Sequence, residues 1–259
     1  MKIAIFTRKK NQKLLDLLDD LQNQTEKFQL NIYTDENFSY WKWNVILTSW
    51  LNIAQKRNLA IWWANDNDFL LLLDDDNRIY DKDFLKKLKD FYFKISYSYK
   101  VISPVVFYRN TNNIQSAWVR FSFLFWKVFV NKKIKWDFWE TPGMWWNSLF
   151  WKWKDFKKAK FDEEIWFIRE DLDYTYSLTK NFCKVFVVNL PINHMEKDKT
   201  WAEKSFLQGE WFYRKIKNRD IFVKKHWNLL QKLVFWGFWR WVSILIWKIK
   251  ILFSKLQKH

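Results

Sequence analysis

Glycine, proline and cysteine are scarce in this chain, which has 3 Gly, 3 Pro and 1 Cys among 259 residues. A single cysteine excludes a disulfide framework within the chain and fits a reducing compartment. Cys183 lies in an apolar run, so we expect a buried structural thiol. No secretion signal is visible, because the first apolar run, Ile3–Phe6, is too short and is followed by Arg8, Lys9 and Lys10. We therefore expect a cytoplasmic protein.

The glycine deficit coincides with a tryptophan excess. An average domain is roughly 7% glycine, or about 18 residues in a chain of this length, whereas this chain has 3 Gly and 21 Trp. The doublets Trp62-Trp63 and Trp145-Trp146 stand in loop-like segments, where turns favour glycine. We hypothesise that UGA codons, which mean glycine in the source lineage, are translated here as tryptophan. The alternative is a genuinely tryptophan-rich lectin or interfacial protein, which requires UGG codons.

The charge balance is strongly basic, with a formal net charge of +17 and a pI of about 9.7. Such a charge favours a polyanionic partner, which can be nucleic acid, an anionic membrane surface or a phosphorylated substrate. The alternative is a solvated lysine-rich surface that reflects an A/T-rich genome. Apolar residues make up 49% of the chain, which is enough for one large folded domain with a short appendage.

Predicted strands and helices alternate along the first two thirds of the chain. This order predicts an α/β fold with a mostly parallel, Rossmann-like sheet and helices on both faces. We expect a catalytic domain over residues 1–200 and a basic helical segment over residues 201–259. The expected strands are residues 2–7, 28–33, 68–73, 101–108 and 184–188, and the expected helices are 11–24, 45–58, 83–93, 147–156 and 169–180.

Three consecutive carboxylates, Asp74, Asp75 and Asp76, follow the apolar run Phe69–Leu73. In open α/β sheets, ligands bind beyond the carboxyl ends of the strands. Adjacent carboxylates repel one another unless a cation is present, and hard divalent cations take oxygen ligands and bridge phosphates. The triplet therefore predicts a site for a metal-bound diphosphate. The alternative is a turn in which aspartates cap the next helix.

A second acidic group, Glu170, Asp171 and Asp173, opens a predicted helix. The helix dipole alone favours carboxylates at this position. The functional interpretation is a general base that deprotonates an acceptor hydroxyl. His194 follows the last predicted strand and is either a structural histidine or a metal ligand beside the carboxylates.

These segments, in this order, resemble the family 2 glycosyltransferases, especially the bacterial rhamnosyl- and galactofuranosyl-transferase-like members. The resemblance runs from residue 2 to about residue 225 and implies the GT-A fold. Leu178-Thr179-Lys180 departs from it, because an arginine is common there. The matching segments are residues 7–25, 32–37 (IYTDEN), 55–58 (QKRN), 69–77 (FLLLLDDDN), 142–150, 161–164 (FDEE) and 169–178 (REDLDYTYSL).

The resemblance also implies a role for each candidate site residue. The donor would be a nucleoside-diphosphate sugar and the metal Mn²⁺ or Mg²⁺. The reaction would be one displacement with inversion, onto a hydroxyl of a cell-surface glycan or lipid-linked acceptor. By resemblance, the donor-binding residues are Thr7, Asp35, Arg57, Asp74 and Asp75, the metal ligands are Asp74, Asp76 and His194, and the catalytic residues are Asp171 and Glu170.

The C-terminal segment carries apolar residues on one helical face of Val242–Leu256, interrupted by lysines. Spanning a bilayer requires about 20 mainly apolar residues. The pattern predicts instead a basic amphipathic helix lying on the anionic inner face of the cell membrane. The alternative is a helix packed on the catalytic domain or a partner.

Two other classes of function stay open. A nucleic-acid-binding protein would explain the basic charge and the interleaved aromatic residues. It leaves both acidic groups unexplained, so we expect no nucleic-acid partner. A tryptophan-rich membrane- or carbohydrate-binding module requires that the tryptophans be genuine.

Overall fold

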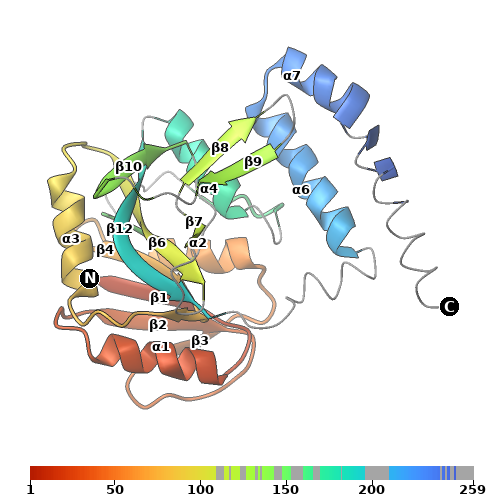
Figure 1. Cartoon of the computed structure of the whole chain (residues 1–259). Helices are drawn as coiled ribbons and strands as arrows, with labels where there is room; N and C mark the ends of the chain where they lie inside the picture. The colour runs from red at the N-terminus through yellow and green to blue at the C-terminus, as the bar shows by residue number, and fades with distance from the viewer. Residues whose placement is uncertain are drawn as a thin grey trace.

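A ten-stranded mixed sheet lies at the centre of the protein, with helices on both faces (Figure 1). The structure is a computed structural model, and the predicted loop residues Trp145 and Trp146 and most of the predicted helix 242–256 lie outside its described residues. Those residues are 1–108, 114–116, 118–122, 127–131, 134, 136–142, 148–152, 160–165, 170–181, 183–195, 210–239, 241–242, 244–245 and 248.

The main sheet has the strand order β10-β12-β6-β11-β4-β1-β2-β3, with β5 paired to β12 and β7 paired to β6. The strands β8 (Trp118–Ser122) and β9 (Lys127–Asn131) form a separate pair. The other strands are β1 (Lys2–Phe6), β2 (Gln29–Thr34), β3 (Asn44–Leu47), β4 (Phe69–Asp74), β5 (Asn77–Arg78), β6 (Lys100–Tyr108), β7 (Ile114–Ser116), β10 (Phe138–Thr141), β11 (Ser148–Lys152) and β12 (Lys184–His194). The helices are α1 (Gln12–Gln22), α2 (Ile53–Trp63), α3 (Phe84–Lys94), α4 (Glu170–Lys180), α6 (Glu210–His226), α7 (Leu229–Val234) and the π-helical turn η2 (Phe235–Trp239).

Most of the sheet is parallel. The strands β12, β6, β4, β1, β2 and β3 run in one direction, and β11 runs antiparallel between β4 and β6. The continuous apolar run of β4 lies in the middle of the sheet, as expected for a strand that is buried on both faces. The predicted fold class is therefore confirmed.

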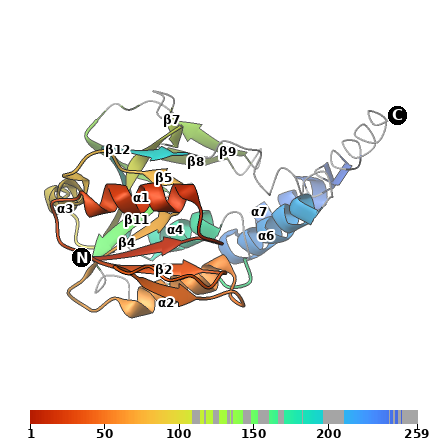
Figure 2. The same cartoon turned by 90° about the horizontal axis from the view of Figure 1, so that it is seen from below.

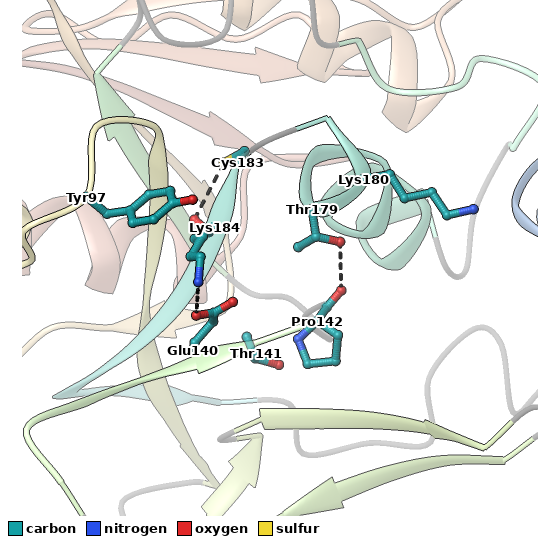
Figure 3. A pocket seen from close by; sticks show the side chains of 8 residues that line it. All are labelled: Tyr97, Glu140, Thr141, Pro142, Thr179, Lys180, Cys183 and Lys184. Atoms are coloured by element: carbon teal, nitrogen blue, oxygen red, sulfur yellow. Dashed lines mark hydrogen bonds and ion pairs between the residues drawn. The ribbon is translucent and has the colours of Figure 1, made fainter.

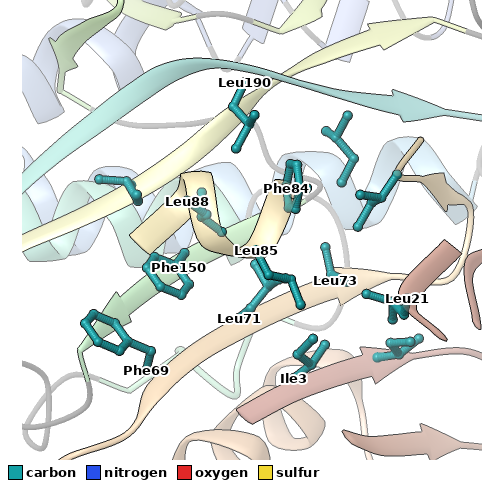
Figure 4. Close-up of a cluster of buried hydrophobic side chains, with 14 of the residues drawn as sticks. Ile3, Leu21, Phe69, Leu71, Leu73, Phe84, Leu85, Leu88, Phe150 and Leu190 are labelled. Atoms are coloured by element: carbon teal, nitrogen blue, oxygen red, sulfur yellow. The ribbon is translucent and has the colours of Figure 1, made fainter. Parts of the chain in front are cut away.

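Alternate side chains of the central strands enter two different apolar cores. Ile3 and Ile5 of β1 join the core beneath α1 and α3, whereas Ala4 and Phe6 join the core beneath α2 and α4. Figure 4 shows the first of these cores, which contains Leu71 and Leu73 of β4 and Leu85 and Leu88 of α3. This alternation gives three layers, helix–sheet–helix, with no exposed face of the central strands.

The sequence prediction of the first helix is confirmed in detail. Asn11 caps α1, since its side-chain oxygen accepts a hydrogen bond of 2.9 Å from the backbone N–H of Leu14. Leu14, Leu17, Leu18 and Leu21 of α1 are buried and Leu15 is partly buried, so the 3.6-residue period correctly identified both the element and its inner face.

Two predicted helices were wrong. Within residues 45–58, the first three belong to the edge strand β3, and α2 begins only at Ile53, after Asn52, whose side chain forms a capping box with Gln55. Residues 148–152 form β11 rather than a helix, and Leu149, Phe150 and Trp151 are all buried there. Periodicity cannot separate a short strand buried on both faces from a buried helix.

The C-terminal elements α6 and α7 lie beside the main body, at one side of the sheet (Figure 2). The end of α6 packs against α4 through Phe222 and Leu172, both of which are buried. Among the described residues, no helix is both long and apolar enough to cross a membrane.

Tryptophan side chains lie in contrasting environments. Trp151 is fully buried in the core beneath α2 and α4. Trp41 and Trp50 are 87% and 72% exposed. The indole nitrogens of Trp43 and Trp139 are buried and have no hydrogen-bond partner among the described residues. A buried donor without a partner is unfavourable, so these two positions agree poorly with tryptophan.

Candidate active site

The register of the parallel strands brings three predicted site segments to one edge of the sheet. Phe6, the last residue of β1, pairs with Tyr33 of β2 on one side and with Asp74 of β4 on the other. Thr7 and Asp35 directly follow these strand ends. We call this edge, which carries Thr7, Asp35, Asp74–Asp76 and His194, the carboxyl edge.

Asp75 is tied to the start of α1. The hydroxyl of Thr7 donates a hydrogen bond of 2.5 Å to Oδ2 of Asp75, and Nδ2 of Asn11 donates one of 3.0 Å to the same oxygen. Burial raises the pKa of the Asp75 carboxyl, and these two hydrogen bonds oppose that rise. The sequence pointed to Asn11 only as a helix cap, so its contact with Asp75 was missed.

Asp76 and His194 meet at the carboxyl edge. His194 ends β12 and pairs with Asn77 of β5. The backbone N–H of the next residue, Met195, donates a hydrogen bond of 2.8 Å to the carbonyl of Asp76. Nε2 of His194 lies 2.8 Å from Oδ2 of Asp76. The other oxygen, Oδ1 of Asp76, is buried without a hydrogen-bond partner in the described part of the chain.

This pair fits a divalent cation that also binds phosphate. A buried carboxylate oxygen with an open lone pair, next to an imidazole nitrogen, offers ligands that Mn²⁺ and Mg²⁺ accept. Within the ranges that the structure describes, no three His, Cys, Asp or Glu side chains gather as a ready-made metal site. Mg²⁺ sites commonly use one or two carboxylates and complete the shell with substrate phosphates and water, so the pair is compatible with such a site.

Asp74 occupies the most acidic part of the edge. Burial raises the pKa of its carboxyl to about 7, the guanidinium of Arg57 opposes this rise, and the neighbouring carboxylates of Asp76, Asp75 and Glu170 add to it. The Asp74 carboxyl is therefore more readily protonated than an ordinary aspartate.

Arg57 joins the two acidic groups that the sequence predicted separately. Its Nη1 lies 2.7 Å from Oε1 of Glu170, and its Nη2 lies 3.4 Å from Oδ1 of Asp74. The guanidinium also lies over the rings of Phe6 and Phe161. The resemblance assigns Arg57 to donor binding, and in the described residues its guanidinium lies between Glu170 and Asp74.

The residues around Arg57 on α2 hold the rest of the edge in place. Lys56 forms an ion pair with Asp35, one of the residues that the resemblance assigns to donor binding. Asn58 donates hydrogen bonds to the carbonyl of Phe161 at 3.1 Å and to Oε1 of Glu163 at 2.9 Å. One helix therefore fixes the strand end at Asp35, the Asp74 carboxylate and the 161–164 loop.

The predicted base lies in the first turn of α4. Glu170 and Asp171 are only 6% and 7% exposed. Oδ1 of Asp171 accepts a hydrogen bond of 2.7 Å from the N–H of Leu172, and Oε2 of Glu170 is buried without a partner in the described residues. Since Arg57 contacts both Glu170 and Asp74, the start of α4 lies next to the carboxyl edge.

A separate cavity of about 650 Å³ lies at the other end of α4 (Figure 3). Its walls include Thr179 and Cys183, and an ion pair of 2.6 Å between Lys184 and Glu140. An α-helix rises about 1.5 Å per residue, so the eleven residues of α4 separate this cavity from Glu170. The predicted buried thiol, Cys183, is confirmed as buried at its edge.

Comparison with known proteins identifies the fold. No family model and no curated protein matches the chain. Among solved structures, TarS of S. aureus superposes with a TM-score of 0.52 at 15% identity over 88% of this chain and 44% of TarS. The mannosyltransferase PcManGT of Pyrobaculum calidifontis, in complex with GDP-Man and Mn²⁺, gives 0.54 at 10% identity over 86% of this chain and 63% of that one.

Both neighbours are GT-A glycosyltransferases, and this chain spans less than two thirds of either. At such low identity the likeness concerns the backbone and not the substrate. The chain has the GT-A fold, with Asp74–Asp76 at the carboxyl ends of the parallel strands and Glu170 next to them.

Proposed function

We propose that this chain is an inverting, metal-assisted glycosyltransferase of the family 2 type, which transfers a sugar from a nucleoside-diphosphate donor to an acceptor hydroxyl. One observation carries the proposal. On a GT-A sheet, the Asp74–Asp76 triplet and His194 share one edge, and Arg57 connects Asp74 to Glu170 of the Glu170-Asp171 pair.

Asp76 and His194, with Asp74 beside them, are the residues proposed to hold the metal ion. A bound divalent cation would neutralise the charge that develops on the leaving diphosphate. The PcManGT structure contains Mn²⁺ and GDP-Man, which supports a divalent cation and a nucleotide-sugar donor in the present proposal. Thr7, Asp35 and Asp75 belong to the proposed donor site.

Asp171 is the proposed general base. The acceptor oxygen forms a bond to the anomeric carbon while the bond from that carbon to the diphosphate oxygen breaks. Asp171 takes the hydroxyl proton, and the N-terminal end of the α4 dipole stabilises its charged form before the reaction. Glu170, the residue before the proposed base, forms an ion pair with the guanidinium of Arg57.

We also propose peripheral attachment to the inner face of the cell membrane. The segment after α6 exposes a run of large apolar side chains beside Lys232 and the exposed Lys248. Apolar residues that insert at the headgroup level, flanked by lysines, suit an anionic lipid surface and a cell-surface glycan or lipid-linked acceptor. The exposed apolar residues are Leu229, Leu230, Leu233, Val234, Trp236, Phe238, Trp241 and Leu245.

Thermal unfolding with a panel of nucleoside diphosphates, with and without Mn²⁺, tests the catalytic proposal. A ligand at 100 times its Kd adds about 2.7 kcal/mol to stability. We expect stabilisation by one nucleotide, dependent on metal and lost in Asp76→Asn. The matched control is Asp137→Asn, which removes an exposed carboxylate that pairs with Lys94. A folded protein that no nucleotide stabilises would argue against the proposal.

Vesicle sedimentation tests the membrane proposal. We expect binding to vesicles with phosphatidylserine, weaker binding at high salt and none to neutral phosphatidylcholine vesicles. Replacing Leu229 and Leu230 by serine removes two exposed apolar side chains and should release the protein. Equal sedimentation of this variant and the parent chain would rule out this surface.

A further inference from the structure

The C-terminal segment contacts the proposed catalytic helix next to the base. Asp173 lies two residues after Asp171 in the first turn of α4, and its side chain is 1% exposed. Among the described residues, the side-chain partners of the buried Asp173 carboxylate are Lys225 and His226, both in the last turn of α6. We call these three residues the α4–α6 clamp.

Each oxygen of Asp173 has its own partner. Nε2 of His226 lies 2.7 Å from Oδ1, and Nζ of Lys225 lies 2.7 Å from Oδ2. The same Lys225 nitrogen lies 3.1 Å from Oδ2 of Asp162 in the loop 161–164. The clamp therefore joins α6, the start of α4 and the loop that Asn58 attaches to the carboxyl edge.

Further contacts hold the two helices together along the same face. The ring of Tyr176 on α4 lies against the imidazole of His226 and the ring of Phe222, both on α6, at centroid distances of 5.0 and 5.3 Å. The ammonium of Lys180, at the end of α4, donates to the carbonyl of His226. These contacts restrict the rotation of α4, and with it the direction in which its first turn faces.

We propose that the α4–α6 clamp positions the general base. The clamp residues do not touch the substrate; Asp173 fixes the first turn of α4, and this turn sets where the Asp171 carboxylate lies relative to the donor. This inference rests on the proposed function. Displacing a catalytic group by about 1 Å can lower the rate roughly 100-fold. Loss of the clamp should therefore lower turnover and leave binding of the donor nucleotide at Asp74–Asp76 intact.

Adjacent lysines provide a matched test. Lys225→Ala removes one clamp contact, Lys225→Arg keeps the charge and the donor, and Lys224→Ala removes an exposed neighbour outside the clamp. His226→Ala and His226→Gln form a second pair, since glutamine retains a donor nitrogen. Steady-state transfer is measured on the full chain well below the melting temperatures of all the variants, and nucleoside-diphosphate affinity is measured in parallel.

We expect kcat to fall about tenfold to 100-fold in Lys225→Ala and His226→Ala, with unchanged nucleotide affinity. Lys225→Arg and His226→Gln should recover most of kcat, and Lys224→Ala should equal the parent. Unchanged kcat in both alanine variants, or equal losses in the arginine and glutamine variants, would overturn the clamp.

Hydrogen exchange at residues 170–176 gives a readout that does not need activity. Both alanine variants should exchange faster there and unchanged in α1. Unaltered exchange across α4 would also overturn the clamp. A different outcome is that the parent protein transfers sugar from no donor while the alanine variants still exchange faster in α4. That result would contradict the proposed function and leave the contact between α4 and α6 established.

Discussion

Removing the guanidinium of Arg57 should destabilise the fold through the two carboxylates that it leaves behind. The side chains of Arg57 and Glu170 are 4% and 8% exposed, so water cannot replace the lost contact. Asp74, at 3.4 Å from Nη2, also loses its cation. We choose Arg57→Met because methionine keeps much of the apolar stem, so that the loss of charge dominates over the loss of packing.

The magnitude follows from burial. Breaking a buried ion pair by removing one partner costs about 3–5 kcal/mol, whereas replacing both partners by apolar residues is often neutral or stabilising. Arg57→Met should therefore cost about 3–5 kcal/mol of unfolding free energy, and Glu170→Met a similar amount. The double variant Arg57→Met/Glu170→Met should be more stable than the sum of the two losses implies, by about 0.5–3 kcal/mol of coupling.

Urea unfolding of the four proteins measures this coupling, and equal m-values would show that the unfolded state has not changed. The cycle of Lys94 and Asp137, an exposed ion pair of 2.7 Å, is the control and should show no measurable coupling. Additive losses at Arg57 and Glu170 would refute the assignment of a buried bridge between the two acidic groups.

The remaining predictions concern the base, the acidic edge and the tryptophans. Asp171→Asn should lower kcat about 100-fold to 10,000-fold, while nucleotides still raise the melting temperature; unchanged transfer would exclude Asp171 as the base. Burial raises the pKa of Asp74 from 3.8 to about 7. With metal removed by a chelator, the contribution of Asp74 to stability therefore falls as the pH rises through this range. Urea unfolding at pH 4 to 7 should show that the free energy of unfolding falls less with pH in Asp74→Asn than in the parent chain. Trp151 is fully buried and should have a UGG codon, and Trp151→Gly should lower the free energy of unfolding by at least about 3 kcal/mol. UGA codons are expected instead at exposed positions such as Trp41. A UGA codon for Trp151 would contradict the first expectation, and UGG codons at every tryptophan would end the recoding hypothesis.

Local patterns predicted the elements whose environment repeats along the chain. The apolar run of β4, the stripe of α1 and its Asn11 cap depend on neighbours within a few residues. Asp74–Asp76 could be placed at a strand end for the same reason. The strand β11 could not be predicted, because a short apolar segment that is buried on both faces has the same hydrophobic pattern in a helix as in a strand.

The sequence by itself determined which residues carry charge, that the apolar run of β4 is buried, and in what order the acidic groups follow one another. Only the tertiary structure decided which of them meet. Arg57 reaches Glu170 across 113 residues of sequence, and His226 reaches Asp173 across 53. The physical reason is that strand order and helix packing are set by the burial of whole faces, and no local pattern specifies which distant side chain will compensate a buried charge.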